Sequence, residues 1–270
     1  MNALPFEFCD SVISTINNIR PLRELVPKLC PRYCKTWKAV MEDHLSNRRE
    51  TNIWLGYSRY GSDSVELLKR MKKKHLRISN IAWCGESLST FDFEMLKYVK
   101  QVGQCTALWM SKRSGTLTSE EKKSFAECLK KISFTEFYLH LPYEAVLRHQ
   151  AQSKILTKLV LKGGGWSKGV QPVIEEMLLT NPIRKVIICE SFVFGKAFVK
   201  NLFDVPCSTS TRKEFEIYTE NLEEFRDFRP HLLVKKNACR VTWRKDDGVT
   251  VTMDFLFDGS IRFDFSKRSD

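Results

Sequence analysis

The chain has 270 residues, of which 43% are hydrophobic and 28% are charged, and its formal net charge is +12. This composition is too apolar for a disordered chain, and we find no apolar run of about 18 residues that would predict a transmembrane helix. Residues 1–10 have neither the basic start nor the apolar core of a secretory signal. We therefore expect a globular protein of the cytoplasm or the nucleus, with no membrane association.

The first 48 residues do not follow the pattern of the rest of the chain. Apolar residues at helical spacing predict a short amphipathic helix over residues 6–16. Two further helices are predicted over residues 21–28 and 33–45. We interpret residues 1–48 as a helical domain that covers the apolar edge of the next domain, as repeat proteins require.

The order of residues in this segment resembles an F-box, a three-helix unit. The family pattern of Leu-Pro-x-Glu, a helix with Ile and Leu, and Cys-x-x-Trp is matched by Leu4, Pro5, Glu7, Ile13, Ile16, Cys34 and Trp37. Tyr33 departs from the usual Val, and the stretch between Ile16 and Cys34 is longer than in the family. The resemblance implies docking to a Skp-type linker protein through Leu4, Pro5, Phe8, Ile13, Ile16, Leu25 and Trp37. The alternative is a helical cap without a linker.

Over residues 49–230 a strand pattern recurs, and each copy is followed by a stretch at helical spacing. The copies have the form φ-x-x-φ-x-φ, where φ is apolar, as in Leu156-Thr157-Lys158-Leu159-Val160-Leu161. The central apolar positions recur every 22 to 29 residues: Ile53, Ile81, Leu108, Phe137, Leu159, Val186 and Phe215. One strand and one helix cannot bury an apolar face alone, so about seven such units are expected to stack with parallel strands.

This pattern resembles leucine-rich repeats over roughly residues 50–220. The resemblance implies an α/β fold in which a curved solenoid of strand–helix units has a concave face lined by strands. The Asn or Cys that usually follows the last strand leucine is absent, and Arg113, Gly164 and Ser191 take its place, so irregular turns are expected. A doubly wound α/β sheet would also alternate strands and helices. We prefer the solenoid, because Gly163-Gly164-Gly165 lacks the register of a nucleotide-binding turn.

The middle residue of each φ-x-φ strand is expected to point away from the helices. These residues form an aromatic and apolar row, and two residues before them lie several polar side chains. Exposed aromatic anchors flanked by lysines are typical of a protein-binding surface. The expected target-binding residues are Trp54, Trp109, Tyr138, Lys158, Val160, Lys185 and Ile187. The alternative is that a loop or the C-terminal tail covers the row.

Residues 231–270 change to the alternating pattern of antiparallel strands. Asp247-Gly248 and Asp258-Gly259 predict turns between them. We expect a β-meander that pairs with the last parallel strand and closes the edge of the sheet. Trp243 and Phe263 are expected to pack on the last helix, which is predicted over residues 221–230.

Catalytic and metal-binding patterns are not found in the sequence. The nine cysteines are expected to be reduced, mostly buried thiols, and no Cys/His spacing completes a zinc site. No Gly-x-Ser-x-Gly motif occurs, and the carboxylate pairs Glu223-Glu224 and Asp246-Asp247 have no acid placed opposite them. The sequence therefore predicts a protein that is not an enzyme and has no cofactor and no metal.

An F-box joined to leucine-rich-like repeats resembles the substrate receptors of cullin-type ubiquitin ligases, and in style the F-box-like proteins expanded in nematodes. The resemblance implies an adaptor that holds a Skp-type linker at one end and a target protein on the repeats. An acidic target would suit the net charge of +12. Two other functions stay open: a protein-binding scaffold without a ligase, and a basic nucleic-acid-binding module with Trp and Lys as a stacking platform.

Overall fold

The computed structural model describes residues 9–10, 35–56, 66, 68–70, 76–85, 87–102, 104–111, 117–189, 191–204, 213–219, 233–236, 240–245, 248–256 and 260–267. The helices expected over residues 21–28 and 221–230 lie outside these ranges, as does most of the helix expected over residues 6–16. No helix among the described residues is long and apolar enough to cross a membrane.

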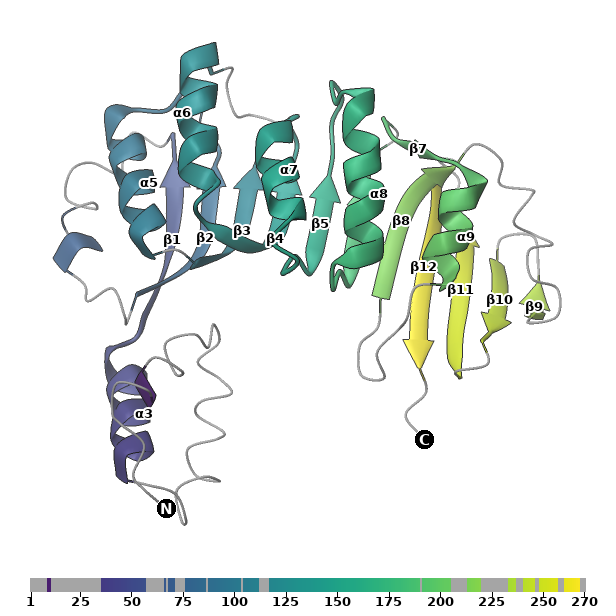
Figure 1. Ribbon diagram of the computed structural model, residues 1–270, viewed down its shortest axis with the longest axis horizontal. Helices are drawn as coiled ribbons and strands as arrows, with labels where there is room; N and C mark the ends of the chain where they lie inside the picture. The colour runs from purple at the N-terminus through teal and green to yellow at the C-terminus, as the bar shows by residue number, and fades with distance from the viewer. Residues whose placement is uncertain are drawn as a thin grey trace.

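The described strands form one open, mixed β-sheet, so the predicted α/β class is confirmed (Figure 1). Seven neighbouring strands are parallel: β1 (Arg49–Leu55), β2 (Leu76–Trp83), β3 (Gln104–Met110), β4 (Ser133–Leu139), β5 (Lys158–Leu161), β6 (Lys185–Ile188) and β8 (Lys213–Thr219). A two-residue strand, β7 (Val193–Phe194), pairs with β8 outside this order.

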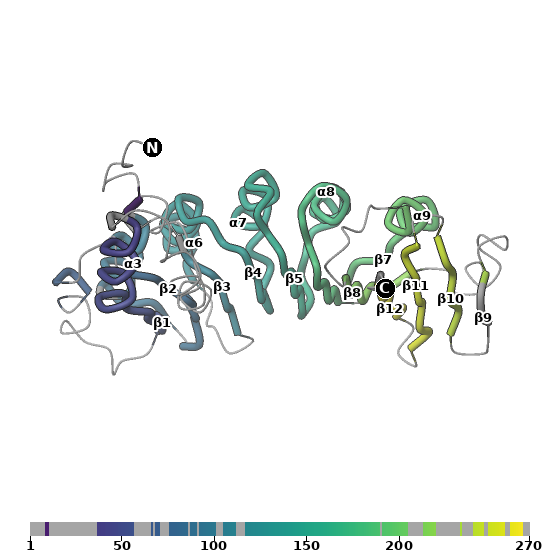
Figure 2. Tube along the Cα trace, turned by 90° about the horizontal axis from the view of Figure 1, so that it is seen from below, coloured from purple at the N-terminus to yellow at the C-terminus, as the bar shows by residue number. Residues whose placement is uncertain are grey.

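Helices connect these parallel strands and lie on one face of the sheet (Figures 1 and 2). They are α5 (Thr90–Val102), α6 (Ser119–Leu129), α7 (Glu144–Ala151), the 3-10 turn η2 (Lys168–Val170), α8 (Gln171–Thr180) and α9 (Lys196–Asp204). Each of the α-helices α5 to α8 packs against the next one along the row. The opposite face, which we call the open face, carries no helix among the described residues.

The central apolar positions of the sequence pattern lie side by side in the sheet. Successive Cα partners are Ile53, Ile81, Leu108, Phe137, Leu159, Val186 and Phe215. Each is at most 2% exposed, and all belong to one hydrophobic core beneath the helices. The repeat pattern therefore predicted both the strands and their register.

The spacing of three between the first two φ positions needs an irregular strand, because a regular strand would place them on opposite faces. Both members of the pair Phe134 and Phe137 are fully buried. The Cα pairing between β3 and β4 skips the residue between them, Thr135, together with Thr106 of β3. The Thr135 Oγ1 donates to the carbonyl oxygen of Thr106 at 2.9 Å, and the Thr157 Oγ1 donates to that of Thr135 at 3.0 Å. These hydroxyls satisfy backbone groups where the regular pairing is interrupted.

The antiparallel end of the sheet agrees with the expected meander. It consists of β9 (Leu233–Lys236), β10 (Arg240–Arg244), β11 (Val249–Phe255) and β12 (Ser260–Lys267), in the sheet order β8-β12-β11-β10-β9. Phe263 of β12 is the Cα partner of Phe215 in β8, the last parallel strand. The Trp243 ring meets Phe203 of α9 edge-to-face, with centroids 5.6 Å apart. The described helix against which the meander packs is thus α9.

The N-terminal part contributes α3 (Lys35–Asn47), which lies away from the row of helices (Figure 1). Its Val40 and Met41 form a small apolar cluster with Cys9, separate from the main core. Nearby, the buried His44 ring makes a hydrogen bond with the carboxylate of Asp10, with Nε2 and Oδ1 3.0 Å apart. Residues 9–10 therefore pack against α3.

Candidate functional site

The open face carries the predicted row of middle residues in register. Successive Cα partners across the seven parallel strands are Trp54, Ala82, Trp109, Tyr138, Val160, Ile187 and Glu216. Trp54 is 40% exposed and Trp109 is 45% exposed, whereas Ala82 and Val160 are buried. Tyr138 and Ile187 are half-buried. The row thus contains two exposed aromatic groups, which we call the two ridges: Trp54 is the first, and the neighbouring Trp109 and Tyr138 form the second. The buried Ala82 lies between them.

The second ridge is a rigid stack of side chains from neighbouring strands. The rings of Trp109 and Tyr138 are stacked, with centroids 3.9 Å apart and an angle of 23° between planes. From the next strand, the Lys158 Nζ lies 4.6 Å from the Tyr138 ring centroid. The Tyr138 hydroxyl donates to a carboxylate oxygen of Glu136 at 2.8 Å. Burial and this carboxylate raise the pKa of the Tyr138 phenol well above its usual range, so the ring stays neutral.

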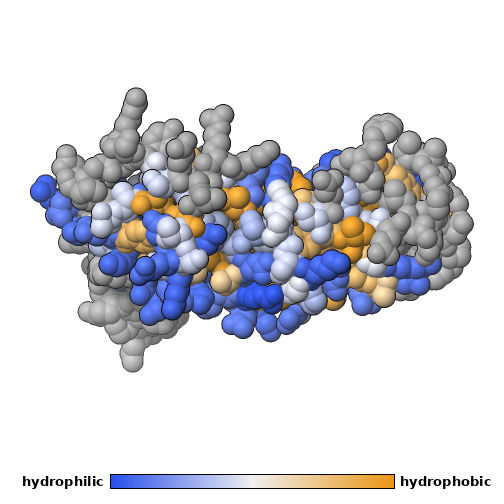
Figure 3. Space-filling model, turned by 90° about the horizontal axis from the view of Figure 1, so that it is seen from above, coloured by the Kyte–Doolittle hydropathy of each residue, from blue (hydrophilic) through white to orange (hydrophobic). Residues whose placement is uncertain are grey.

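A cavity of about 350 Å³ lies between the two ridges, and we call it the aromatic slot. It is lined by Trp54, Asn80, Ala82, Cys84, Trp109, Met110, Ser111, Tyr138 and His140. The small side chain of Ala82, on the strand between the two tryptophans, creates the space. Figure 3 shows the edge of the sheet at which the parallel strands end, with the helix-bearing side at the bottom of the picture. That side is mostly hydrophilic, and hydrophobic patches lie above it in this view.

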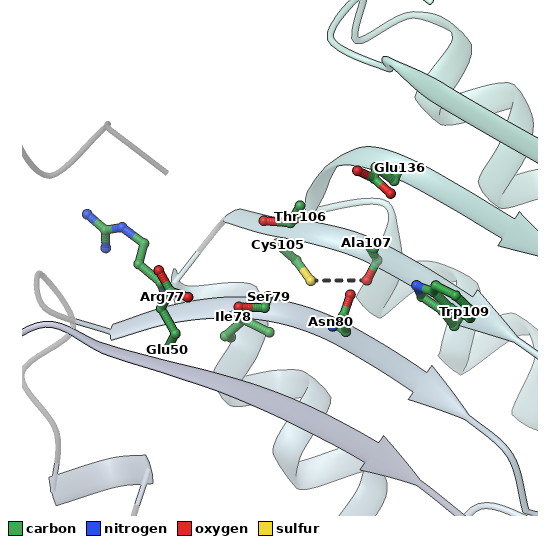
Figure 4. A pocket seen from close by; sticks show the side chains of 10 residues that line it. All are labelled: Glu50, Arg77, Ile78, Ser79, Asn80, Cys105, Thr106, Ala107, Trp109 and Glu136. Carbon is green, nitrogen blue, oxygen red and sulfur yellow. Dashed lines mark hydrogen bonds between the residues drawn. The ribbon is translucent and has the colours of Figure 1, made fainter. Parts of the chain in front are cut away.

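A second cavity of about 380 Å³ adjoins the slot along β2 and β3, and both cavities share Asn80 and Trp109 (Figure 4). Its lining is more polar and includes Glu50, Arg77 and Glu136. Burial, together with the charge of Arg48, lowers the pKa of the Arg77 guanidinium to about 10. The alternation of side chains in the sequence does not single out Arg77, because the skipped residue in β2, Ser79, changes which side chains face outward before Asn80.

Several charged side chains on the described part of the open face form pairs of opposite sign. Lys158 lies 3.9 Å from Glu136, and Lys185 lies 3.4 Å from Glu214. On the antiparallel side, an Arg262 nitrogen lies 2.7 Å from Glu216, and Arg240 pairs with Asp254. The two lysines that were expected to bind the target are therefore also partners of carboxylates within the face.

Three of the seven predicted target-binding residues lie together around the slot, and one of the others, Val160, is buried. Trp54, Trp109 and Tyr138 frame the slot, while Ile187 lies farther along the row. Val160 is only 5% exposed, so it forms part of the floor of the row and offers little surface to a partner.

The predicted linker-binding residues are mostly outside the described part of the chain. This applies to Leu4, Pro5, Phe8, Ile13, Ile16 and Leu25. Trp37 is described: it is half-buried and packs against the small cluster of Cys9, Val40 and Met41.

Within the described residues, no group of three or more His, Cys, Asp or Glu side chains is arranged to hold a metal ion. Comparisons with models of protein families, with curated proteins and with solved structures found no match to the chain.

Proposed function

We propose that the protein is a non-enzymatic receptor whose open face binds a target protein and whose F-box-like N-terminal segment binds the Skp-type linker of a cullin-type ubiquitin ligase. The observation that carries the proposal is the exposure of Trp54 and Trp109, in register, on the open face, where the described part of the chain places no helix. Exposed tryptophans are costly in water and are the commonest energetic anchors of protein–protein interfaces.

The charge distribution of the open face favours a protein partner over a nucleic acid. A surface that binds nucleic acid needs surplus Lys and Arg for the phosphates. On this face the cations Lys158, Lys185 and Arg262 each lie within 4 Å of a carboxylate. A polyanion laid along the row would therefore meet Glu136, Glu214 and Glu216 as well as these cations.

The arrangement of strands and helices supports a leucine-rich-repeat-like solenoid as the finer description of the parallel part. Seven parallel strands lie in register, and the described helices that connect them lie on one face. Helices are wider than strands, so stacking them on one face bends the sheet and makes the strand-lined face concave. Repeat proteins bind their partners on concave faces of this kind.

The link to a ligase rests on the sequence resemblance of the first 37 residues. The separate small cluster around Cys9, Val40 and Met41 fits an N-terminal unit with its own packing. In such a unit Trp37 contributes to the packing of the small cluster. Residues such as Leu4 and Pro5 are then expected to form the linker-binding surface.

Target binding is tested by affinity purification of the full chain from cells of its source, with quantitative mass spectrometry of the partners. Trp54→Ala and Trp109→Ala are expected to lower target recovery at least about tenfold, the effect of losing an interface anchor. Leu179→Ala is the matched control, because Leu179 is a similarly exposed apolar residue (37%) on α8. Equal recovery with all three variants would rule out the open face as the target-binding surface.

The ligase link is tested in the same purification. A Skp-type linker is expected among the partners of the wild-type chain and of Trp109→Ala, and it is expected to be lost from the double variant Leu4→Ala/Pro5→Ala. Absence of such a linker from the wild-type partners would refute the ligase role. The protein would then be a scaffold that binds its target through the open face.

A further inference from the structure

We propose that the aromatic slot binds a proline ring of the target protein, presented by an extended segment that crosses the open face. This inference rests on the proposed function and names the chemistry that the face recognises. It is carried by three features: the spacing of the two tryptophans on the sheet, the uncharged lining of the slot and the apolar side chains that follow it along the row.

The width of the slot is set by the sheet. Trp54 and Trp109 stand on strands separated by one other strand, and Ala82 lies between them as the Cα partner of both. Neighbouring strands are about 4.8 Å apart, so the two tryptophan backbones are about 9.6 Å apart. Because carbon atoms in contact lie about 3.5–4.0 Å apart, side chains that rise from backbones at this separation leave room for one small ring between them. A proline ring is of this size.

The second tryptophan is held in place without a ligand. Stacking on Tyr138 at 3.9 Å, with Lys158 over the far side of that ring, fixes one face of Trp109. Trp109 and Trp54 both line the slot, with Ala82 between them as the Cα partner of each. A ring that enters the slot therefore meets a wall that is already ordered, which lowers the entropic cost of binding.

The chemistry of the lining selects an uncharged group. Among the residues that the structure describes, no Lys, Arg, Asp or Glu side chain lines the slot. A guanidinium, an ammonium or a carboxylate would lose its water there without a counter-charge in the lining, which is costly. The net charge of +12 further disfavours a cationic ligand.

Proline also suits the surface that a ligand backbone would cross. Beyond the slot the row continues over the apolar side chains of Val160 and Ile187. Neither side chain offers an acceptor for a ligand N–H, and an unsatisfied N–H that becomes buried costs free energy. Proline has no N–H, and proline-rich segments are already extended before they bind.

An amide pair at the edge of the slot can orient such a ligand. The Asn80 Nδ2 donates to the Asn52 Oδ1 at 2.8 Å, so the two side chains brace each other across β1 and β2. Asn52 is exposed, and its own Nδ2 is in a position to donate to the carbonyl of a ligand peptide.

The test uses the full chain with ¹⁵N-labelled tryptophan and an acetylated, amidated decaproline peptide as the probe. The indole N–H signals of Trp54 and Trp109 are assigned with Trp→Phe variants and followed during titration. Decaproline is expected to shift both signals saturably, while the signals of the fully buried Trp83 and Trp243 stay in place. A Gly-Ser decapeptide of equal length is the control probe, and it is expected to cause no saturable shift.

Two variants make the assignment specific. Trp54→Ala removes one exposed wall, and Ala82→Leu fills the slot, so each is expected to weaken decaproline binding at least about tenfold. Leu179→Ala is expected to bind like the wild type. Ala82→Leu changes a buried position and could prevent folding. Trp54 is 40% exposed, so Trp54→Ala is expected to fold and still tests the slot.

The proposal is overturned if decaproline shifts neither signal, if both slot variants bind it as well as the wild type, or if oligouridylate shifts these signals and decaproline does not. The last result would identify a nucleobase slot. Target recovery that depends on Trp109 without any decaproline binding would overturn the proline assignment alone and leave the proposed function standing. Decaproline binding with target recovery that is insensitive to Trp109 would overturn the proposed function alone.

Discussion

At the scale of single residues, two glycines show how tightly the ends of β1 and β2 approach each other. A Cβ on Gly85 would lie 1.9 Å from the carbonyl oxygen of Gly56, and Gly56 itself has a φ of +75°. The Gly56 N–H donates to a carboxylate oxygen of Asp92 at 3.2 Å, and the other oxygen of Asp92 accepts from the Ser89 N–H at 2.7 Å. The chain therefore leaves β1, just after Trp54, through a turn that admits no side chain.

Gly85→Ala is expected to lower the free energy of unfolding by about 3 kcal/mol, because the added methyl group meets backbone atoms that cannot rotate away. Gly164→Ala is the matched control: a Cβ there has no heavy atom within 4 Å, and we expect a change within about 0.5 kcal/mol. Urea denaturation followed by circular dichroism measures both. Similar losses in the two variants would contradict the close approach.

Cys105 offers a prediction about pH. Its side chain is 4% exposed, and burial raises the pKa of the thiol from 9.0 to about 12. Because the folded-state pKa is the higher one, the thiol stabilises the fold below pH 9, and this contribution is lost as the pH rises toward 12. Iodoacetamide at pH 8 is expected to label Cys189 well before Cys105 in the folded protein, as mass spectrometry can show. The fall in stability from pH 9 upward should be smaller in Cys105→Ala, and an identical fall would refute this assignment.

At the scale of elements, a buried amide joins helix α7 to strand β4. The Gln150 side chain is 1% exposed. Its Nε2 donates to the carbonyl oxygen of Ile132 at 2.6 Å, and its Oε1 accepts from the Phe134 N–H at 3.3 Å. At the end of α8, Asn181 donates to the carbonyl oxygen of Ala151 at 3.4 Å. Amides at the C-terminal ends of helices thus satisfy backbone groups near the starts of the strands and at the ends of neighbouring helices.

Gln150→Leu is expected to lower the free energy of unfolding by about 3 kcal/mol, since it leaves a buried carbonyl and a buried N–H without this partner. Gln152→Leu changes an exposed glutamine two residues away, and we expect less than about 0.5 kcal/mol from it. Thermal or urea unfolding distinguishes the two. If the buried and the exposed substitution had the same small effect, the amide would not support the turn.

The sequence predicted the elements best where burial alone decides the pattern. The seven central positions from Ile53 to Phe215 were predicted in register, because each must be apolar to lie under the helices. The same alternation placed Trp54 and Trp109 on the open face. The slot between them was not predicted, since it depends on the small size of Ala82 and on the stacking of Trp109 with Tyr138. Periodicity encodes which face a side chain takes, and it does not encode how neighbouring rings lean.

At the scale of the whole molecule, the sheet changes from parallel to antiparallel where β12 pairs with β8. Phe263 and Phe265 of β12 are almost fully buried, and Phe265 meets Phe215 of β8 edge-to-face with centroids 5.6 Å apart. Removing β12 would expose both an apolar surface and the hydrogen-bonding edge of a long strand. Such an edge readily pairs with another chain.

Truncation after residue 219 is therefore expected to convert the protein into large aggregates. Size-exclusion chromatography with light scattering measures this directly. A chain that lacks only residues 268–270 is the control, and we expect it to elute like the full-length protein. A soluble truncated protein of unchanged oligomeric state would show that β12 is dispensable for covering β8.

The in-register row on the open face has a consequence for how this protein can evolve. Each position of the row belongs to a different strand–helix unit, and its side chain is separated by the sheet from the core residues of that unit. Under the proposed function, a mutation at one position would change which target the face binds without altering the residues that maintain the fold. Duplication or exchange of a whole unit would shift the pattern of exposed side chains by one strand. A receptor of this kind would acquire new targets through single substitutions.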